Sequence, residues 1–502
     1  MILFLSISSV LAGNTEPQTN EPILAKIYLK HQTDIGQLAA VGFDLVEVKP
    51  DFIKALVSSE QITWLRNRGF TTELLSLSEL ADWSVTKKAA AGLYHTYNET
   101  TTELRQIEAS HENIAKVIVL GKSIQGRDIL AIKISDNPSL EEEAEPNVLF
   151  MGCHHAREWI SVEMPLYLAN YLVSNYESNP EVKKLVDERE TWIVPIVNPD
   201  GLEYSQTIYT LWRKNMRDNN GNSFFERSYD GVDLNRNYGY KWGYDDIGSS
   251  PYPEDETFRG KNAFSEPETQ AIGKLAVAHN FIFAISFHSY GQVMVYPWGY
   301  ANLDTVDDRL FTDVASKMAF FNGYAYGNAK DGVMYNTNGD VTDWLYAQSG
   351  TLGYTIELAT AFIPPENQIE QIWLKNKNAT LYLLLTADNP RQIYPNIGVF
   401  TDKASYSNGD MMKVGIELKH SENAIVVGIG VWVDLPNGDK YWVVHEPYVT
   451  VPKGFNYNNL EWKSFVLPTL QPGNYSWHAV VVDAYTMYRM SESKYSWVFN
   501  AS

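Results

Sequence analysis

The stretch that decides the fold reads Val148-Leu149-Phe150-Met151-Gly152-Cys153-His154-His155-Ala156-Arg157-Glu158-Trp159. It begins with a continuously apolar run, which is typical of a strand buried on both faces of a sheet. Ionisable side chains follow at once, and α/β sheets bind ligands at the carboxyl ends of their strands. His155 and Glu158 are three residues apart in a tight turn. Such a turn can direct an imidazole and a carboxylate at one Zn²⁺ ion, with ligand atoms about 2.0 to 2.2 Å away.

A third metal ligand must come from elsewhere in the chain. The only cysteine is Cys153, which excludes an intrachain disulfide and a Cys-rich metal site, so a metal must use His and carboxylate. His288 follows the apolar run Phe281 to Phe287 and is predicted to lie at another strand end. His154 offers a competing spacing of four residues to Glu158, and the residues alone leave that choice open.

Length and composition limit the class of protein. At roughly 100 to 200 residues per domain, 502 residues suggest about three domains. With 44% hydrophobic and 20% charged residues, the chain is neither fibrous nor largely disordered. The formal charge of -21 opposes binding to nucleic acid or to anionic lipid. Beyond the N-terminus, no apolar run approaches ~18 residues, so the sequence predicts no membrane span.

Hydrophobic patterning divides the chain into five segments. Residues 1–13, which are apolar from Ile2 to Leu11, are predicted to be a signal peptide of a secreted or periplasmic protein, and a frayed apolar end is the alternative. Residues 22–77 mix strand-like and helix-like runs in a small α+β unit, and residues 78–93 form a protease-accessible linker. Residues 94–387 alternate strands and helices in an α/β domain with a mixed sheet, and residues 395–502 hold short alternating runs typical of a β-sandwich.

The predicted elements of these segments follow in chain order. In the small unit the predicted strands are 25–29, 43–48 and 70–75, and the predicted helices are 34–40 and 59–67. In the α/β domain the predicted strands are 117–120, 129–135, 148–152, 191–197, 281–287 and 353–358, and the predicted helices include 161–176, 266–278 and 368–385. In the sandwich the predicted strands include 425–433, 440–444, 475–482 and 495–499.

Residues 92 to 387 resemble the metallocarboxypeptidases of the carboxypeptidase A/B type. The family's zinc motif matches His155-Ala156-Arg157-Glu158-Trp159, and its downstream motif matches His288-Ser289-Tyr290. Three further matches occur in the family's order: Asn198-Pro199-Asp200-Gly201, Leu211-Trp212-Arg213-Lys214 and Gly231-Val232-Asp233-Leu234-Asn235-Arg236-Asn237. The resemblance implies a mixed, eight-stranded-type sheet flanked by helices, and an exopeptidase that removes C-terminal residues.

The resemblance also implies a role for each matched residue. One catalytic Zn²⁺ would be bound by His155, Glu158 and His288, with His155 preferred to His154 because it alone fits the family pattern. Glu357 matches the general base that acts on a zinc-activated water, and Arg213 matches the residue that stabilises the developing oxyanion. Asp233 matches the carboxylate that orients the first zinc histidine.

Substrate binding is assigned in the same way. Asn235 and Arg236 match the clamp for the substrate's terminal carboxylate, Tyr335 matches the tyrosine that closes over it, and Arg157 matches a residue that assists outer binding. The terminal-residue pocket matches Met334, Asp340, Thr342, Thr355, Ser286 and Val295. Asp340 and Thr342 look like the pattern of the broad-specificity carboxypeptidase T, which implies apolar and also basic terminal residues. The competing interpretation is that Asp340 only caps its loop and faces solvent.

The segments on either side of the α/β domain have expected roles of their own. Residues 22–77 resemble the family's pro-domain, which covers the cleft until a protease cuts the linker, with Lys87 and Lys88 as the expected cut site. A permanent accessory domain is the alternative.

Exposed aromatic residues of the sandwich could bind sugar or protein, although an ordinary core is the simpler interpretation. The rival functions are a zinc peptidase acting on peptidoglycan stem peptides and a noncatalytic binding protein on the same fold.

Overall fold

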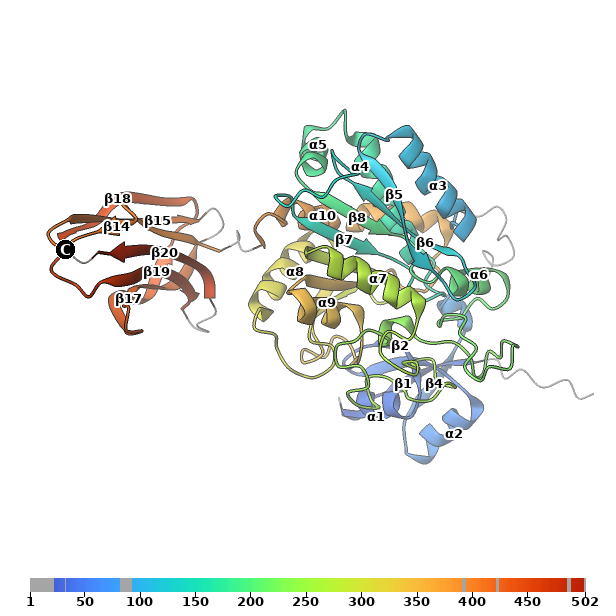
Figure 1. Cartoon of the computed structure of the whole chain (residues 1–502). Helices are drawn as coiled ribbons and strands as arrows, with labels where there is room; N and C mark the ends of the chain where they lie inside the picture. Colours follow the sequence, from blue (N-terminus) through green and yellow to red (C-terminus); the bar gives the residue numbers. More distant parts are fainter. Residues whose placement is uncertain are drawn as a thin grey trace, which may run out of the picture.

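The computed structural model describes residues 22–31, 33–81, 93–390, 394–420, 424–484 and 489–500. They form an N-terminal α+β unit, a central α/β domain and a C-terminal β-sandwich (Figure 1). The expected signal peptide and the expected cut site at Lys87 and Lys88 lie outside the described residues. Among the described residues, no helix has the length and apolar character needed to cross a membrane.

The central domain is built on one mixed sheet of eight strands, in the order β11-β10-β12-β9-β7-β8-β6-β5. The middle strands β8, β7, β9 and β12 run parallel, and antiparallel pairs occur toward both edges. The predicted α/β fold with a mixed sheet is confirmed. The strand bounds are β5 (Ala115–Lys122), β6 (Asp128–Ile134), β7 (Asn147–Met151), β8 (Glu190–Val194), β9 (Phe281–Ser289), β10 (Val293–Val295), β11 (Ala325–Gly327) and β12 (Leu352–Leu358).

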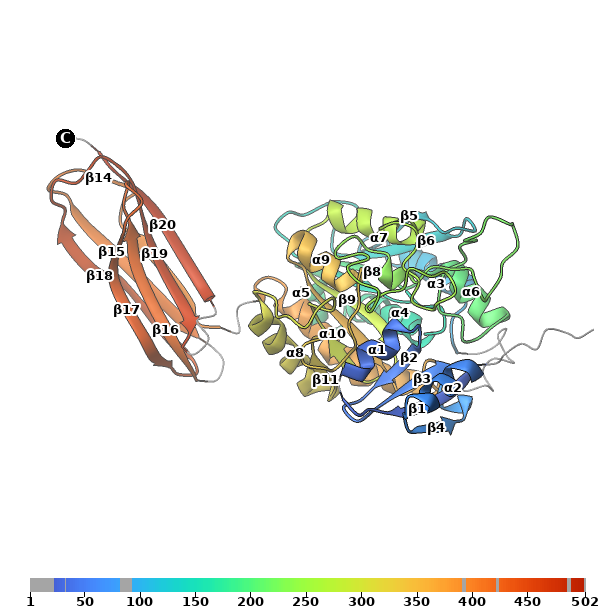
Figure 2. The same cartoon turned by 90° about the horizontal axis from the view of Figure 1, so that it is seen from below.

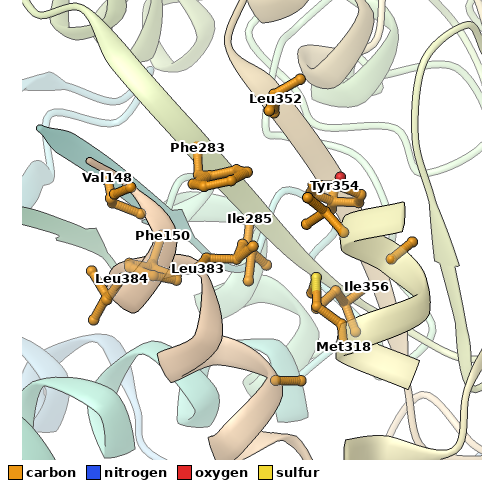
Figure 3. Close-up of a cluster of buried hydrophobic side chains, with 14 of the residues drawn as sticks. Val148, Phe150, Phe283, Ile285, Met318, Leu352, Tyr354, Ile356, Leu383 and Leu384 are labelled. Atoms are coloured by element: carbon orange, nitrogen blue, oxygen red, sulfur yellow. The ribbon is translucent and has the colours of Figure 1, made fainter. Parts of the chain in front are cut away.

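Helices cover both faces of this sheet. The helix bounds are α3 (Tyr97–Ser110), α4 (Ile160–Asn175), α5 (Pro180–Asp187), α6 (Pro199–Thr207), α7 (Pro267–Ala278), α8 (Asp308–Asn322), α9 (Val341–Ser349) and α10 (Ile369–Thr386). Alternate strand residues point to opposite faces. Phe283 and Ile285 of β9 therefore join the cluster formed with α4, α8 and α10, while Ala284 joins the cluster formed with α7 and α9. Figure 3 shows the first cluster, with Met318 of α8 and Leu383 of α10 beside the strand residues.

The N-terminal unit has a βαββαβ order and a four-stranded antiparallel sheet, β2-β3-β1-β4. This is the split βαβ arrangement of ferredoxin-like folds. Its elements are β1 (Ile23–Tyr28), α1 (Thr33–Ala40), β2 (Asp44–Val48), β3 (Phe52–Val57), α2 (Ser59–Asn67) and β4 (Thr72–Leu75). Strand β3 was not among the predicted elements. Leu24, Val46 and Leu56 are buried in the same hydrophobic cluster as the central domain, so the two units share a core.

The C-terminal sandwich packs a three-stranded sheet, β13-β15-β18, against a five-stranded sheet, β14-β20-β19-β16-β17. Figure 2 shows it beside the central domain, separate from the N-terminal unit. The strand bounds are β13 (Asn396–Thr401), β14 (Ser405–Tyr406), β15 (Met411–His420), β16 (Ile425–Asp434), β17 (Lys440–Val451), β18 (Phe455–Val466), β19 (Gly473–Asp483) and β20 (Arg489–Phe499). Trp477 and Trp497 lie in its core, whereas Tyr441, Trp442 and Tyr448 are exposed.

Candidate active site

Three predicted metal ligands meet at the carboxyl ends of two adjacent parallel strands. His155 and Glu158 lie in the turn after β7, and His288 lies near the end of β9, which pairs with β7. His155 Nδ1 is 2.7 Å from Glu158 Oε1, His288 Nδ1 is 2.9 Å from Glu158 Oε2, and the two Nδ1 atoms are 3.1 Å apart. Two imidazole nitrogens and a carboxylate are a donor set that zinc prefers. The side chains that converge here therefore fit a zinc ion.

The turn that carries two of these ligands depends on a glycine and a serine. A Cβ atom at Gly152 would lie 2.1 Å from the backbone oxygen of Ser161, so no other residue fits without a shift of the backbone. Ser161 Oγ accepts a hydrogen bond from the Cys153 amide at 3.0 Å and donates one to the Glu158 carbonyl at 2.5 Å. The start of α4 thus holds the turn in place.

His154 points away from the ligand cluster. His154 Nε2 lies 2.8 Å from the Tyr238 hydroxyl, and His154 Nδ1 lies 3.1 Å from Ser286 Oγ. One group of described side chains able to hold an ion consists of His155, Glu158 and His288, and His154 is not in it. The geometry therefore favours the three-residue spacing from His155 to Glu158.

Asp233 connects the cluster to Arg213. Asp233 Oδ1 lies 3.1 Å from His155 Nε2, and Arg213 donates to Asp233 Oδ2 from Nε at 3.0 Å and from a terminal nitrogen at 2.8 Å. Burial alone would raise the pKa of Asp233, but the charges of Arg213 and His155 outweigh it and hold that pKa well below its usual range. Asp233 is thus an ionised acceptor that fixes the His155 ring.

A cavity of about 470 Å³ opens in front of the ligand cluster. Glu357 lines it from β12, where it pairs in register with His288 of β9. Enclosure in the protein and the neighbouring charge of Glu158 raise the pKa of Glu357 well above its usual range, against the opposing charges of Arg213 and Arg236. A carboxylate at the cavity wall with a raised pKa is suited to proton transfer.

The predicted clamp residues lie together in this cavity, which Asn235, Arg236 and Tyr335 all line. Arg236 lies under the ring of Tyr335, with its guanidinium carbon 5.9 Å from the ring centroid, and one terminal nitrogen is 3.4 Å from the Tyr335 hydroxyl. Among the described residues, Arg236 Nε is buried without a hydrogen-bond partner. The Val341 amide donates to Asn235 Oδ1 at 3.0 Å, which orients the Asn235 side chain.

The predicted terminal-residue pocket is assembled with one exception. Met334, Asp340, Thr342, Thr355 and Val295 line the cavity. Ser286 is not among its lining residues and is fully buried behind His288. Asp340 caps α9 by accepting from the Asp343 amide at 2.9 Å and also accepts from the hydroxyls of Thr337 and Thr342. Asp340 therefore agrees with part of each interpretation. It caps α9, yet it lies at the cavity wall and is only 5% exposed, rather than facing solvent.

Arg157 has a partner that sequence reasoning missed. It donates to both carboxylate oxygens of Asp44, at 2.7 and 2.9 Å, and Asp44 is the first residue of β2 in the N-terminal unit. Its guanidinium also lies over the ring of Phe362, 4.3 Å from the centroid. Residues 45–50 line the cavity. No local sequence pattern predicts this ion pair, because Asp44 resembles any other polar residue at a strand end.

Comparison with known proteins identifies the family. The family model described as zinc carboxypeptidase matches residues 100–379, which include every metal-ligand, base and clamp candidate. The chain belongs to the zinc carboxypeptidase family. It is a metallocarboxypeptidase, a peptide hydrolase, and the predicted enzyme class is confirmed.

Individual relatives agree with this family. A zinc carboxypeptidase of Saccharothrix mutabilis subsp. capreolus is 34% identical over 59% of this chain and 70% of the relative. Metallocarboxypeptidase A of Arthroderma otae is 32% identical over 55% of this chain and 67% of the relative. The crystal structure of carboxypeptidase A from Helicoverpa armigera shares the fold with a TM-score of 0.64 at 23% identity, covering 74% of this chain and 98% of that one.

Proposed function

We propose that this metallocarboxypeptidase hydrolyses the C-terminal peptide bond of peptides and proteins with one zinc ion held by His155, Glu158 and His288. One observation carries the proposal. His155, Glu158 and His288 each offer one ligand atom, these atoms lie within 4.8 Å of one another, and the three side chains share a cavity with Glu357 and with the Asn235 and Arg236 pair. That arrangement supplies a metal, a base and a cationic carboxylate site at one place.

A zinc ion held by His155, Glu158 and His288 would act as a Lewis acid toward the scissile carbonyl and would make a water molecule more acidic. Glu357 accepts the proton from that water and returns it to the leaving amine. Arg213, which Asp233 holds, stabilises the negative charge that develops on the carbonyl oxygen. Arg236 and Asn235 bind the free terminal carboxylate, and Tyr335 closes over the substrate.

The pocket supports a broad preference for the terminal residue. Met334 and Val295 provide apolar contacts, while the Asp340 carboxylate at the wall provides a partner for a cationic side chain. We therefore propose that the enzyme releases Leu, Phe or Met and also Arg or Lys, with the apolar group somewhat favoured.

The N-terminal unit supports latency as part of the same proposal. Its β2 strand and the following turn line the cavity, and Asp44 occupies Arg157, the residue proposed to assist outer substrate binding. The predicted linker 78–93 is not accessible at its start, because Leu80 and Ala81 are buried and Ala81 pairs with Ile363. The precursor is therefore proposed to stay inactive until an activating protease cuts near residues 87–92. Export as a secreted or periplasmic protein would bring the precursor to such a protease.

Metal analysis combined with release of terminal amino acids tests the proposal. The mature enzyme should contain one zinc ion per chain and release the terminal residue of a free peptide. His288→Ala should lose both properties. His154→Ala is the matched control, because it removes an adjacent imidazole outside the ligand cluster and should retain one zinc at saturating metal. Full zinc occupancy and activity in His288→Ala would contradict the ligand set.

The same assay separates the rival functions. A peptidase for peptidoglycan stem peptides need not keep Asn235, Arg236 and Tyr335 as a standard carboxylate clamp, and their shared cavity argues against it. A noncatalytic binding protein should lack a ligand or the base, and all four side chains line this cavity. Cleavage of stem peptides in preference to linear peptides would support the first rival, and zinc binding without any release would support the second.

A further inference from the structure

A chain of buried polar side chains lies behind the proposed zinc ligand His288. His288 Nε2 is 3.0 Å from Ser286 Oγ, Ser286 Oγ is 3.1 Å from His154 Nδ1, and His154 Nε2 is 2.8 Å from the Tyr238 hydroxyl. His288 is 1% exposed, and the other three side chains are fully buried. Ser286 and His154 do not line the substrate cavity.

The backbone fixes the members of this chain relative to one another. Ser286 and His288 are two residues apart on β9, so their side chains emerge on the same face of the sheet. The rings of His154 and His288 are stacked, with centroids 5.5 Å apart and planes 17° apart. The Tyr238 amide donates to the Gly339 carbonyl at 2.9 Å, which fixes the far end. These contacts hold the four groups in one arrangement.

The tautomer of His288 determines which group donates in the hydrogen bonds between these side chains. His288 Nδ1 faces Glu158 and His155, so its lone pair is the one available to a metal. A neutral imidazole that offers Nδ1 carries its proton on Nε2, and that N–H must donate a hydrogen bond when it is buried. His288 Nε2 has Ser286 Oγ within hydrogen-bond distance, at 3.0 Å. Ser286 can serve only while its own hydroxyl is oriented, and His154 and Tyr238 supply that orientation.

We propose that Ser286, His154 and Tyr238 are positioning residues, which hold the tautomer and ring orientation of His288 for zinc. The inference rests on the proposed zinc site. The two proposed histidine ligands then have different hydrogen-bond partners. His155 contacts the carboxylate of Asp233, whereas His288 contacts Ser286, the first member of the uncharged chain Ser286, His154 and Tyr238, which we call the relay. Partners of metal-bound histidines of this kind commonly change metal affinity by about 10- to 100-fold when removed.

Zinc affinity of the full-length chain tests the relay, measured by competition with a chelator of known affinity. Ser286→Ala should bind zinc about 10- to 100-fold more weakly. His154→Phe and Tyr238→Phe, which keep ring shape, should weaken binding by progressively less. Thr380→Val is the matched control, because it removes another fully buried hydroxyl, bonded to the Asn376 carbonyl in α10, and should leave zinc affinity unchanged.

A spectroscopic readout separates positioning from general damage. In zinc-loaded protein with ¹⁵N-labelled histidine, the Nε2 proton of His288 should shift in Ser286→Ala and in His154→Phe but not in Thr380→Val. The thermal midpoint of the metal-free protein should fall by less than that of the zinc-loaded protein. Should Ser286→Ala fail to fold, the ring-preserving variants at 154 and 238 carry the same expectation.

The outcomes distinguish the relay from the site itself. Unchanged zinc affinity and an unchanged His288 resonance in the variants, with one zinc bound by the unmutated chain, would overturn the relay alone. An unmutated chain that binds no zinc, or a His288→Ala variant that binds it normally, would overturn the proposed zinc site.

Discussion

The carboxylate of Asp44 and the guanidinium of Arg157 form a bidentate ion pair between two units of the chain, with oxygens and nitrogens 2.7 and 2.9 Å apart. The two residues are 113 positions apart, and Arg157 directly precedes the proposed ligand Glu158. Burial opposes ionisation of Asp44, but Arg157 lowers its pKa below the usual range. The pair is therefore ionised at neutral pH and holds β2 against the cavity.

Latency should depend on this ion pair. The precursor spanning residues 14 to 502 should be nearly inactive until it is cut near residues 87–92. Asp44→Ala should raise the activity of the uncut precursor, because removing one partner of a buried ion pair commonly costs about 3 to 5 kcal/mol. Peptide release by uncut protein, verified intact by mass spectrometry, measures the effect.

Asp51→Asn is the control for that variant, since Asp51 is exposed on the same unit. Full activity in the intact, unmutated precursor would make residues 22–77 a permanent accessory domain instead.

Replacing Glu357 by Gln should keep zinc content and substrate affinity but lower kcat by about 10² to 10⁴-fold, because the amide keeps the shape and removes the base. Steady-state kinetics and metal analysis on the same preparation check both halves. A near-normal kcat would show that a group other than Glu357 accepts the proton of the attacking water.

The preference for a free C-terminus should depend on Arg236. Arg236→Ala should chiefly lose discrimination between free and amidated peptides, because the terminal carboxylate loses its charge-assisted partner. Relative kcat/KM for matched free and amidated peptides measures it. Equal cleavage of the two by the unmutated enzyme would contradict the clamp.

Asp340→Asn should reduce kcat/KM for a C-terminal Arg by roughly 10- to 200-fold while that for Leu barely changes. Asn is also a good N-cap, so α9 should remain intact. An equal fall for both substrates would indicate structural damage, and no fall for Arg would remove Asp340 from specificity.

His95 predicts a pH dependence of stability outside the catalytic site. Hydrogen bonds to Glu103 and Glu163, both at 2.8 Å, raise the pKa of His95 to about 10, from about 6.5 in the unfolded chain. Its contribution to stability is then complete below about pH 6.5 and is lost as the pH rises through about 10.

His95→Gln should accordingly lower the free energy of unfolding more at pH 6 than at pH 10. Denaturant unfolding at both pH values checks this, with His111→Gln at the end of α3 as the control. A loss of equal size at both values would refute the charged pair.

The α/β fold of the central domain was predictable because strands such as β7 and β9 are continuously apolar over most of their length. The predicted strand at 148–152 corresponds to β7, and the three candidate ligands lie close together because parallel strands end at one edge of the sheet. The predicted strand 191–197 ends earlier, at Val194, because Pro195 cannot donate a ladder hydrogen bond. β10 and β11 are three residues long, too short for a periodic pattern.

Other features depend on the tertiary fold and leave no local signal. The pairing of Asp44 with Arg157 requires two units to dock. Ser286 matched a pocket position by resemblance, yet it lies behind His288 because both side chains leave the same face of β9. Spacing could not choose between His154 and His155 as a candidate ligand, whereas in the structure the His155 ring faces Glu158 and the His154 ring faces Tyr238.

The position of β9 between two hydrophobic clusters makes its length intolerant of insertion or deletion. Phe283 and Ile285 point to one cluster, while Ala284, Ser286 and His288 point to the other face. A single residue gained or lost before His288 would turn its imidazole toward the cluster of α4, α8 and α10, and would put Phe287 or Ser289, respectively, in its place. Substitutions can accumulate along this strand in evolution, but selection is expected to remove insertions and deletions within it.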